Sequence, residues 1–323
     1  MIIKSAEDKG TQIALLQSLQ NRPDATSEIR KRIEQEIRNI RAGAKGEHEA
    51  AYEMGFHYGA SAYWMLIHDL RIECDGRVAQ IDHIVINRFL EIWVCESKHF
   101  SEGIGINEHG ECSAFYGGKP YGVPSPIEQN RKHIAVLASV FKTGMVKLPT
   151  RLGFNINPTI NSLILVSKGA RISRPKAKID GLENIIKNDQ FKARIDKSID
   201  DDKNPLGMAK LIGIDTLEDF ARKIAAIHRP IEFDWHAKFG LSKESPAVQS
   251  LALLANSETL KPPVARRSKA DESVDMVAEE KPKQKLICYT CGSSVTYAVA
   301  KFCWFNKPKF GGNIFCMECQ KKV

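Results

Sequence analysis

The sequence predicts a mixed α/β protein followed by a small metal-binding module. Two observations support this: helical and strand patterns occur in the order αβββαβ before residue 167, and five of the eight cysteines lie between residues 288 and 319. The 323 residues are 43% hydrophobic and 27% charged, which is typical of a globular protein. The length is sufficient for two domains, or for one large domain with an appendage.

Residues 25–41 form the first predicted helix. Isoleucines recur there every three or four residues with charged residues between them, namely Ile29, Ile33, Ile37 and Ile40. Gly43 and Gly46 then interrupt this pattern. A second helix is expected to begin with Glu47.

Three antiparallel strands are predicted next, at residues 64–72, 78–87 and 90–97. These runs are rich in β-branched and aromatic residues and are separated by short polar turns. Residues 101–123 are rich in glycine, with two short alternating runs, and indicate a loop or a small hairpin.

A further helix and a buried strand complete the predicted core. Ser125 and Pro126 open the helix, since proline is tolerated in a first turn, and apolar residues continue to Phe141. Residues 162–167 are continuously apolar, which favours a buried strand. Residues 170–230 indicate mixed α/β or helical structure, with a helix at 216–227.

Three charged residues stand in the second and third predicted strands: Asp82, Glu96 and Lys98. Glu96 and Lys98 leave the same face of a strand, and a turn around residues 88–89 would place Asp82 opposite residue 95 or 96. An unpaired buried charge is costly, and a metal ion is the simplest compensation. Asp82 and Glu96 would suit Mg²⁺ or Mn²⁺, and Lys98 would assist an attacking water. The alternative is an ordinary cross-strand ion pair.

Four short motifs carry a resemblance to a known family. "GEHEAAYEMGF", "QIDHIVIN", "CESKHF" and "PSPIEQNRKH" follow one another in the order and spacing of the nuclease-related domain (NERD), a branch of the PD-(D/E)XK nuclease superfamily. The resemblance covers residues 43–167 and implies a restriction-endonuclease-like core. Ile81 stands where the superfamily's name places proline, as is usual in this branch.

The resemblance also implies a catalytic set. Asp82, Glu96 and Lys98 take the metal-binding and catalytic places, Glu47 the acidic place on the first helix, and Gln129 that of a glutamine on the helix after the sheet. Two of these residues have structural roles as alternatives to catalytic ones. Glu47 would be an ordinary acidic residue in a first helical turn, and Gln129 would cap its helix or link the helix to the sheet.

Two histidines lie close to these motifs. His83 follows Asp82 and is expected to pack on the opposite face of its strand. His133 lies one helical turn after Gln129 and could face the same cleft.

The C-terminal cysteines predict a zinc site. They have the spacing C-x2-C-x24-C-x2-C, which suits a tetrahedral site with four thiolates, Cys288, Cys291, Cys316 and Cys319. Cys303 is expected to pack inside the module. The tail resembles a zinc ribbon, with strands expected at 295–305 and 310–315. A module of this size buries too little apolar surface to fold without its metal.

Charge distribution favours a polyanionic partner. The net charge is +8, and residues 281–323 contain eight lysines and one acidic residue. Lysines and aromatic residues of the tail would bind phosphates and bases, although these aromatics would serve equally as a small core. Zinc ribbons also serve as protein-docking modules, so a protein partner is the alternative.

The sequence predicts five segments: an N-terminal helical extension at 1–42, a NERD nuclease-like domain at 43–167, an α/β or helical extension at 168–255, a flexible linker at 256–286 and a zinc ribbon at 287–323. The linker region has almost no large apolar residues. No apolar run approaches the roughly 18 residues of a membrane span, and the charged N-terminal stretch is unlike a secretory signal, so we expect a cytoplasmic protein.

The expected function is metal-dependent nuclease activity, with DNA as the substrate, Mg²⁺ (or Mn²⁺) at the active site and Zn²⁺ in the tail. Two alternatives remain: a nucleic-acid-binding protein without cleavage, and a protein-docking component of a DNA repair or defence complex.

Overall fold

The chain forms two compact units, residues 1–259 and 260–323. The computed structural model describes residues 1–201, 210–243, 287–295, 299–300, 303, 310–311 and 313–321. Each unit is considered by itself. The predicted linker at 256–286 lies outside the described residues.

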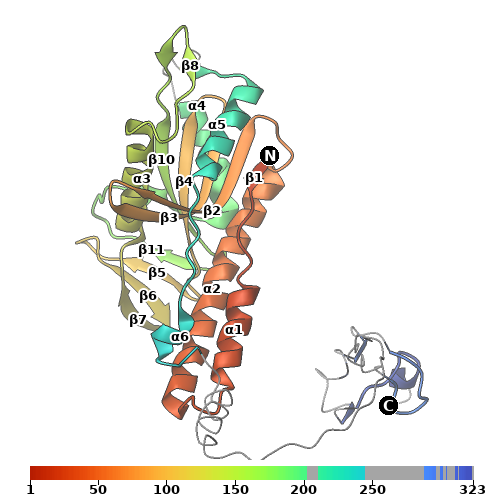
Figure 1. Cartoon of the computed structure of the whole chain (residues 1–323). Coiled ribbons are helices and arrows are strands. Elements are labelled where there is room, and N and C mark those ends of the chain that lie inside the picture. The colour runs from red at the N-terminus through yellow and green to blue at the C-terminus, as the bar shows by residue number, and fades with distance from the viewer. Residues whose placement is uncertain are drawn as a thin grey trace, which may run out of the picture. The chain divides into compact units, whose positions relative to one another are not determined.

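A six-stranded mixed sheet forms the centre of the first unit (Figure 1), with the strand order β1-β2-β3-β4-β10-β12. Strands β2, β3 and β4 are antiparallel to one another, whereas β1 runs parallel to β2, β10 parallel to β4, and β12 parallel to β10. The bounds are Ile2–Lys4 (β1), Trp64–Cys74 (β2), Arg77–Asn87 (β3), Glu91–Lys98 (β4), Thr159–Val166 (β10) and Ile185–Lys187 (β12).

Helices cover both faces of this sheet. α3 (Pro126–Lys142) and α5 (Ile214–Ala226) pack on one face, and α2 (Ser27–Tyr58) and α4 (Phe191–Asp201) on the other. The order α2, β2, β3, β4, α3, β10 is the predicted αβββαβ order, so the mixed α/β fold class is confirmed.

The predicted break at Gly43 and Gly46 is wrong, because α2 is one continuous helix of 32 residues. Glycine inside a helix costs about 1 kcal/mol relative to alanine. At Gly46 a close contact explains the choice, since an added Cβ would lie 3.0 Å from His99 Cβ and 3.2 Å from His99 N. Gly46 therefore lets the chain just beyond β4 approach the helix.

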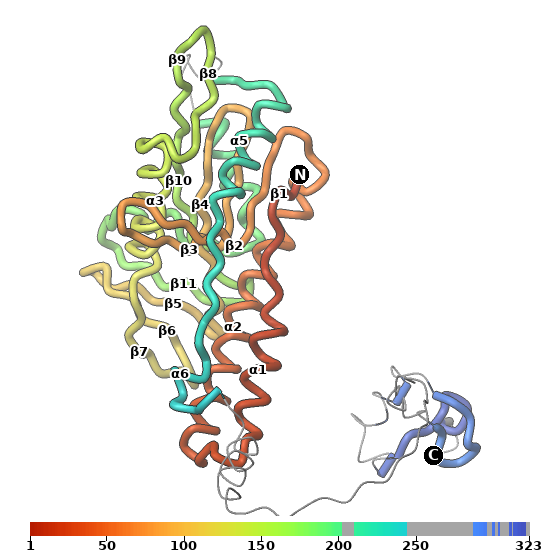
Figure 2. The backbone as a smooth tube through the Cα atoms, viewed as in Figure 1, coloured from red at the N-terminus to blue at the C-terminus, as the bar shows by residue number. Residues whose placement is uncertain are grey.

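The first half of α2 belongs to a separate apolar cluster. It packs there with α1 (Gly10–Gln20), which lies beside it in Figure 2, and with α6 (Trp235–Phe239). The buried residues of this cluster are Leu16, Leu19, Ala25, Ile33, Ile37, Trp235, Phe239 and Leu241. Residues 42 and 43, where the N-terminal extension was expected to end, lie inside α2.

A second sheet follows β4 in the chain. It has the order β11-β5-β6-β7, and β8 and β9 form a separate pair. The bounds are Gly103–Ile106 (β5), Cys112–Tyr116 (β6), Lys119–Val123 (β7), Thr150–Arg151 (β8), Phe154–Asn155 (β9) and Arg171–Ser173 (β11), with 3₁₀ turns at Leu182–Asn184 (η1) and Asn188–Gln190 (η2).

The second unit is small and has its own core. Cys288, Cys303, Phe310 and Phe315 are buried together, and Ile287 pairs with Ser294 in an antiparallel bridge. Of the strand expected at 295–305, positions 299, 300 and 303 are helical, so the expectation is wrong there. Ala300 and Cys303 are both buried, a three-residue spacing that suits a helix and not a strand.

The length and polarity of the helices decide whether any of them could span a membrane. In the part of the chain that the structure describes, each helix is too short or too polar to cross a bilayer.

Candidate active site

Asp82 and Glu96 lie side by side on neighbouring antiparallel strands. The β3–β4 ladder ends with the pair His83–Cys95, and Asp82 and Glu96 are the residues directly beyond this pair on the two strands. The backbone N–H of Ser97 donates to Asp82 Oδ2 at 2.7 Å and so fixes this carboxylate. The predicted juxtaposition of the two acids is therefore present in the fold.

Glu96 is almost fully buried, with 2% exposure. Its Oε1 accepts a hydrogen bond from Lys98 Nζ at 2.7 Å, and its Oε2 lies 3.2 Å from His133 Nδ1 on α3. Burial alone would raise the pKa of Glu96, but His133 and Lys98 outweigh it and hold the pKa below its usual range.

Two buried atoms at this contact lack a hydrogen bond. Neither Glu96 Oε2 nor His133 Nδ1 finds a well-oriented partner among the described residues, although the two atoms face each other. A buried acceptor without a hydrogen bond is rare and calls for an explanation such as an ion.

Asp82 behaves in the opposite way to Glu96. Its pKa is raised well above the usual range because it is desolvated and because the carboxylates of Glu96 and Glu47 repel its charge. A bound cation would remove this repulsion.

Glu47 approaches the same acids from α2, next to Gly46. It is half-buried, and its pKa is raised by burial first and then by Asp69 and Glu96, with Lys9 and Lys98 acting against them. Glu47 also lines a cavity of about 560 Å³, whose other polar and charged side chains are Glu7, Asp8, Lys9, Arg41, Lys45 and His48. Glu47 therefore adds a third carboxylate beside an open space.

The surroundings of Gln129 indicate its role less clearly than those of the acidic residues do. It is half-buried on α3, on the same helical face as His133, and no hydrogen bond of its side chain is recorded among the described residues. The link from helix to sheet is made by its neighbour Asn130, whose Nδ2 donates to Val94 O at 2.9 Å and Ser162 Oγ at 2.8 Å.

His83 faces away from this site, as expected. It is buried on the opposite face of β3, where its Nδ1 lies 2.8 Å from His68 Nδ1 and its Nε2 lies 2.9 Å from Ser97 Oγ. Ser97 thus joins this polar cluster to Asp82 through its own backbone N–H.

Sequence reasoning did not identify Asp69 and Lys9. Asp69 is buried in the middle of β2, has a left-handed φ of 53° and lies opposite Asp82, between the pairs His68–His83 and Leu70–Ile81. Lys9 Nζ donates to Asp69 Oδ2 at 2.9 Å. A charged residue inside a strand-like run was the available clue, the same one that drew attention to Asp82.

The donor set suits a divalent cation. Asp82 and Glu96 provide hard oxygen ligands, and the buried Glu96 Oε2 contacts His133 Nδ1 at 3.2 Å without a well-oriented hydrogen bond among the described residues. Lys98 supplies a positive charge at the same end of β4.

The comparison with protein families agrees with this geometry. Residues 42–167 match the nuclease-related domain (NERD) family. The matched segment includes Glu47, Asp82, Glu96, Lys98 and Gln129, and the resemblance inferred at 43–167 is confirmed. Comparison with curated proteins gave no match, and comparison with solved structures gave none.

Lys9 and Asp69 differ in their relation to the nuclease-related domain. Asp69 lies inside the matched segment, whereas Lys9 precedes it by more than thirty positions. Lys9, which donates a hydrogen bond to Asp69 next to these acidic residues, therefore lies outside the segment that matches the family.

The second candidate site is formed by the four predicted zinc ligands. One sulfur atom from each of Cys288, Cys291, Cys316 and Cys319 lies within 4.8 Å of the others, and this is the one such group of three or more metal-binding side chains among the described residues. Cys303 lies outside this group, and its Sγ accepts a hydrogen bond from Phe315 N at 3.3 Å.

The electrostatics of the cysteines favour a cation. The backbone N–H of Cys316 donates to Cys288 Sγ at 3.2 Å, and such N–H groups lower the pKa of Cys288 to about 6. The sulfur of Cys316, followed by those of its neighbours, raises the pKa of Cys319 to about 12. Since a zinc ion stabilises all four thiolates together, the cluster is compatible with Zn²⁺.

Proposed function

We propose that this protein is a metal-dependent nuclease that hydrolyses phosphodiester bonds in DNA. The observation that carries the proposal is the buried Glu96, which lies beside Asp82 and contacts Lys98 at 2.7 Å and His133 at 3.2 Å. The match of residues 42–167 to the nuclease-related domain supports it.

Asp82 and Glu96 would hold Mg²⁺ or Mn²⁺. When bound, such an ion lowers the pKa of a coordinated water and offsets the charge that develops on the phosphate. The N–H of Ser97 keeps one Asp82 oxygen in place, and His133 limits the movement of Glu96.

The reaction is a hydrolysis. A water oxygen attacks the phosphorus, the bond from phosphorus to the leaving oxygen breaks, and that oxygen takes up a proton. Lys98 Nζ, which contacts Glu96 Oε1 at 2.7 Å, would donate to a phosphate oxygen or orient the water. Glu47, whose pKa is raised, sits beside the open cavity and is suited to accept or return a proton. Gln129 would orient the substrate from α3.

The choice of DNA rests on charge and on the tail. The net charge of +8, with eight lysines in residues 281–323, favours a polyanion. The four-cysteine module would add affinity or direct the nuclease to its target.

The experiment measures cleavage of labelled single-stranded and double-stranded DNA, and of RNA, with Mg²⁺ or Mn²⁺ and with excess chelator. We expect metal-dependent cleavage of DNA by the wild type and a loss of at least about a hundredfold in Glu96→Gln and Lys98→Met. Glu128→Gln and Lys132→Met are matched controls, because both residues are exposed on α3; they should retain activity.

The outcomes distinguish a nuclease from a nucleic-acid-binding protein and from a protein-docking module. Metal-independent cleavage, or equal activity in all four variants, would contradict the proposal. DNA binding by the wild type without any cleavage would favour a binding protein on the same fold, and absence of both would favour a protein-docking role.

A further inference from the structure

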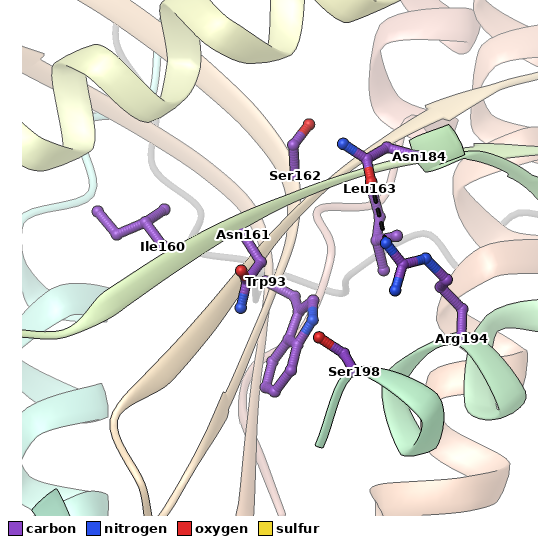
Figure 3. Close-up of a pocket in the computed structure, with 8 residues that line it drawn as sticks. All are labelled: Trp93, Ile160, Asn161, Ser162, Leu163, Asn184, Arg194 and Ser198. Atoms are coloured by element: carbon purple, nitrogen blue, oxygen red, sulfur yellow. Dashed lines mark hydrogen bonds between the residues drawn. The ribbon is translucent and has the colours of Figure 1, made fainter. Parts of the chain in front are cut away.

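A polar hollow lies on the face of the central sheet that α4 covers (Figure 3). Its volume is about 260 Å³. Its lining residues are Trp93, Ile160, Asn161, Ser162, Leu163, Asn184, Arg194 and Ser198. Trp93 and Glu96 lie three positions apart on β4, so their side chains leave opposite faces, and the hollow is separate from the candidate active site.

The sequence of β10 explains why this space is open. On the face that packs against α2 and α4, Leu163 and Leu165 fill the core, whereas Asn161 stands two positions earlier in the same row. Asn161 is the ladder partner of Trp93. An amide therefore occupies a position where the pattern of the strand would place an aliphatic side chain.

Helix α4 supplies the opposite wall. Phe191 and Ile195 of this helix are buried in the core, while Arg194 and Ser198, one turn apart, line the hollow together. In Figure 3 the Arg194 guanidinium points toward Asn184 at the end of η1, and the Ser198 hydroxyl lies beside the Trp93 indole.

The hollow contains more hydrogen-bond donors than its own acceptors satisfy. Arg194 Nη2 donates to Asn184 Oδ1 at 3.3 Å, and in the part of the chain that the structure describes the Asn184 amide nitrogen and most guanidinium N–H groups make no further hydrogen bond. Within the described ranges no carboxylate lies within ion-pair distance of Arg194, and no acidic residue lines the hollow. A half-buried guanidinium without a carboxylate partner is available to bind an anion.

We propose that this hollow binds the phosphate group of a small phosphate monoester. Arginine offers a bidentate donor pair to a phosphate, and the Asn184 and Asn161 amides with the Ser198 hydroxyl can serve the remaining oxygens. Three terminal oxygens match this set better than the two of a carboxylate. The volume exceeds that of a phosphate ion, so the hollow also accommodates the adjoining part of the ligand.

The test uses the full chain, with its metals bound, and isothermal titration with inorganic phosphate and with ribose 5-phosphate. We expect one site on the wild type and at least about tenfold weaker binding in Arg194→Gln, since a charged hydrogen bond is lost. Lys197→Gln is the matched control, because Lys197 is exposed on the same helix; its affinity should change less than about twofold.

A second variant keeps the test decisive if Arg194→Gln does not fold. Asn161→Leu fills the position with an aliphatic side chain, which suits its row on β10, and should abolish binding while thermal unfolding remains cooperative. Absence of phosphate binding by the wild type, equal affinity in Arg194→Gln, or an equal loss in Lys197→Gln would overturn the proposal. Acetate serves as the carboxylate probe, and acetate binding tighter than phosphate binding would overturn it as well.

Discussion

Lys9 Nζ lies 2.9 Å from Oδ2 of Asp69, and this ion pair ties the segment before α1 to the middle of β2. Asp69 is 5% exposed and also accepts hydrogen bonds from Glu7 N at 3.3 Å and Gln80 Nε2 at 3.1 Å. Burial would raise the pKa of Asp69, but Lys9 and the other donors hold it below its usual range. The pair stabilises a left-handed residue directly opposite Asp82.

Replacing Lys9 by methionine should therefore destabilise the first unit. The Asp69 carboxylate would lose its cation while staying buried, at a cost of about 2 kcal/mol at pH 7. Because the folded pKa of Asp69 is depressed, this contribution is present above the unfolded pKa and disappears as the pH falls through the folded value. Urea unfolding at pH 7 and at a pH well below 3.8, the ordinary pKa of an aspartate, measures both effects.

Lys45→Met is the control for that prediction. Lys45 is exposed and lies 3.9 Å from Glu49 on α2, so its loss should cost less than about 0.5 kcal/mol. Equal stability of the two variants would show that Lys9 has no special role.

Gly46→Ala should destabilise the protein, although alanine is the better helix former. The new Cβ would meet His99 Cβ and the His99 backbone nitrogen at 3.0 and 3.2 Å, and the overpacking should exceed the helix gain by about 1 kcal/mol. Gly55→Ala is the matched control on the same helix, since nothing lies within 4 Å of its Cβ position; it should stabilise by roughly 0.5–1 kcal/mol. Thermal melts of both variants decide the matter, and stabilisation by Gly46→Ala would contradict the close contact.

The buried His68 should make the fold sensitive to acid. Burial, with a smaller effect of Lys4, lowers the pKa of His68 to about 4. Below pH 6.5 the unfolded chain binds a proton that the folded chain does not, so stability falls as the pH drops from about 6.5 to 4, by about 3 kcal/mol in all. Comparison of unfolding at pH 7.5 and pH 5 should show a smaller loss in His68→Asn than in the wild type. His109→Asn, at an exposed histidine, should behave like the wild type.

Removal of zinc should affect the tail alone. Chelation should expose Cys288, Cys291, Cys316 and Cys319 to a thiol reagent, because a zinc ion bound by these four sulfurs would hold the small core together. With a zinc chelator in the presence of excess Mg²⁺, the main unfolding transition of residues 1–259 should stay within about 1 °C, since its core contains none of these cysteines. Cys291→Ser should reduce zinc content in the same way, whereas Cys303→Ala should retain one zinc per chain. A full zinc complement in Cys291→Ser would contradict the four-cysteine site.

Local rules predicted the pairing of Asp82 with Glu96 because it depends only on strand alternation and a short turn. The C-terminal cysteine cluster was predictable for the same reason, since two-residue spacing brings two sulfurs together whatever the rest of the chain does. His133 was foreseen only as a neighbour of Gln129, because which residue of α3 meets Glu96 depends on how the helix packs.

Other features depend on distant contacts that periodicity does not encode. The value of Gly46 lies in the approach of His99, more than fifty residues later in the chain. The Lys9–Asp69 pair joins residues sixty positions apart and requires a left-handed residue within a strand. The hollow beside Arg194 arises where Asn161, the polar member of an otherwise apolar row on β10, meets one face of α4, and neither segment indicates it alone.

The continuity of α2 has a practical consequence for dissecting the protein. Similarity to the nuclease-related domain begins at residue 42, but that residue is an interior position of a helix that starts at Ser27. A fragment cut at the start of the similarity would fray at its new end, only a turn before Glu47, and would lack Lys9. Truncation at a boundary drawn from sequence similarity would thus disturb the surroundings of Glu47 and Asp69, and an inactive fragment would say little about the activity of the intact protein.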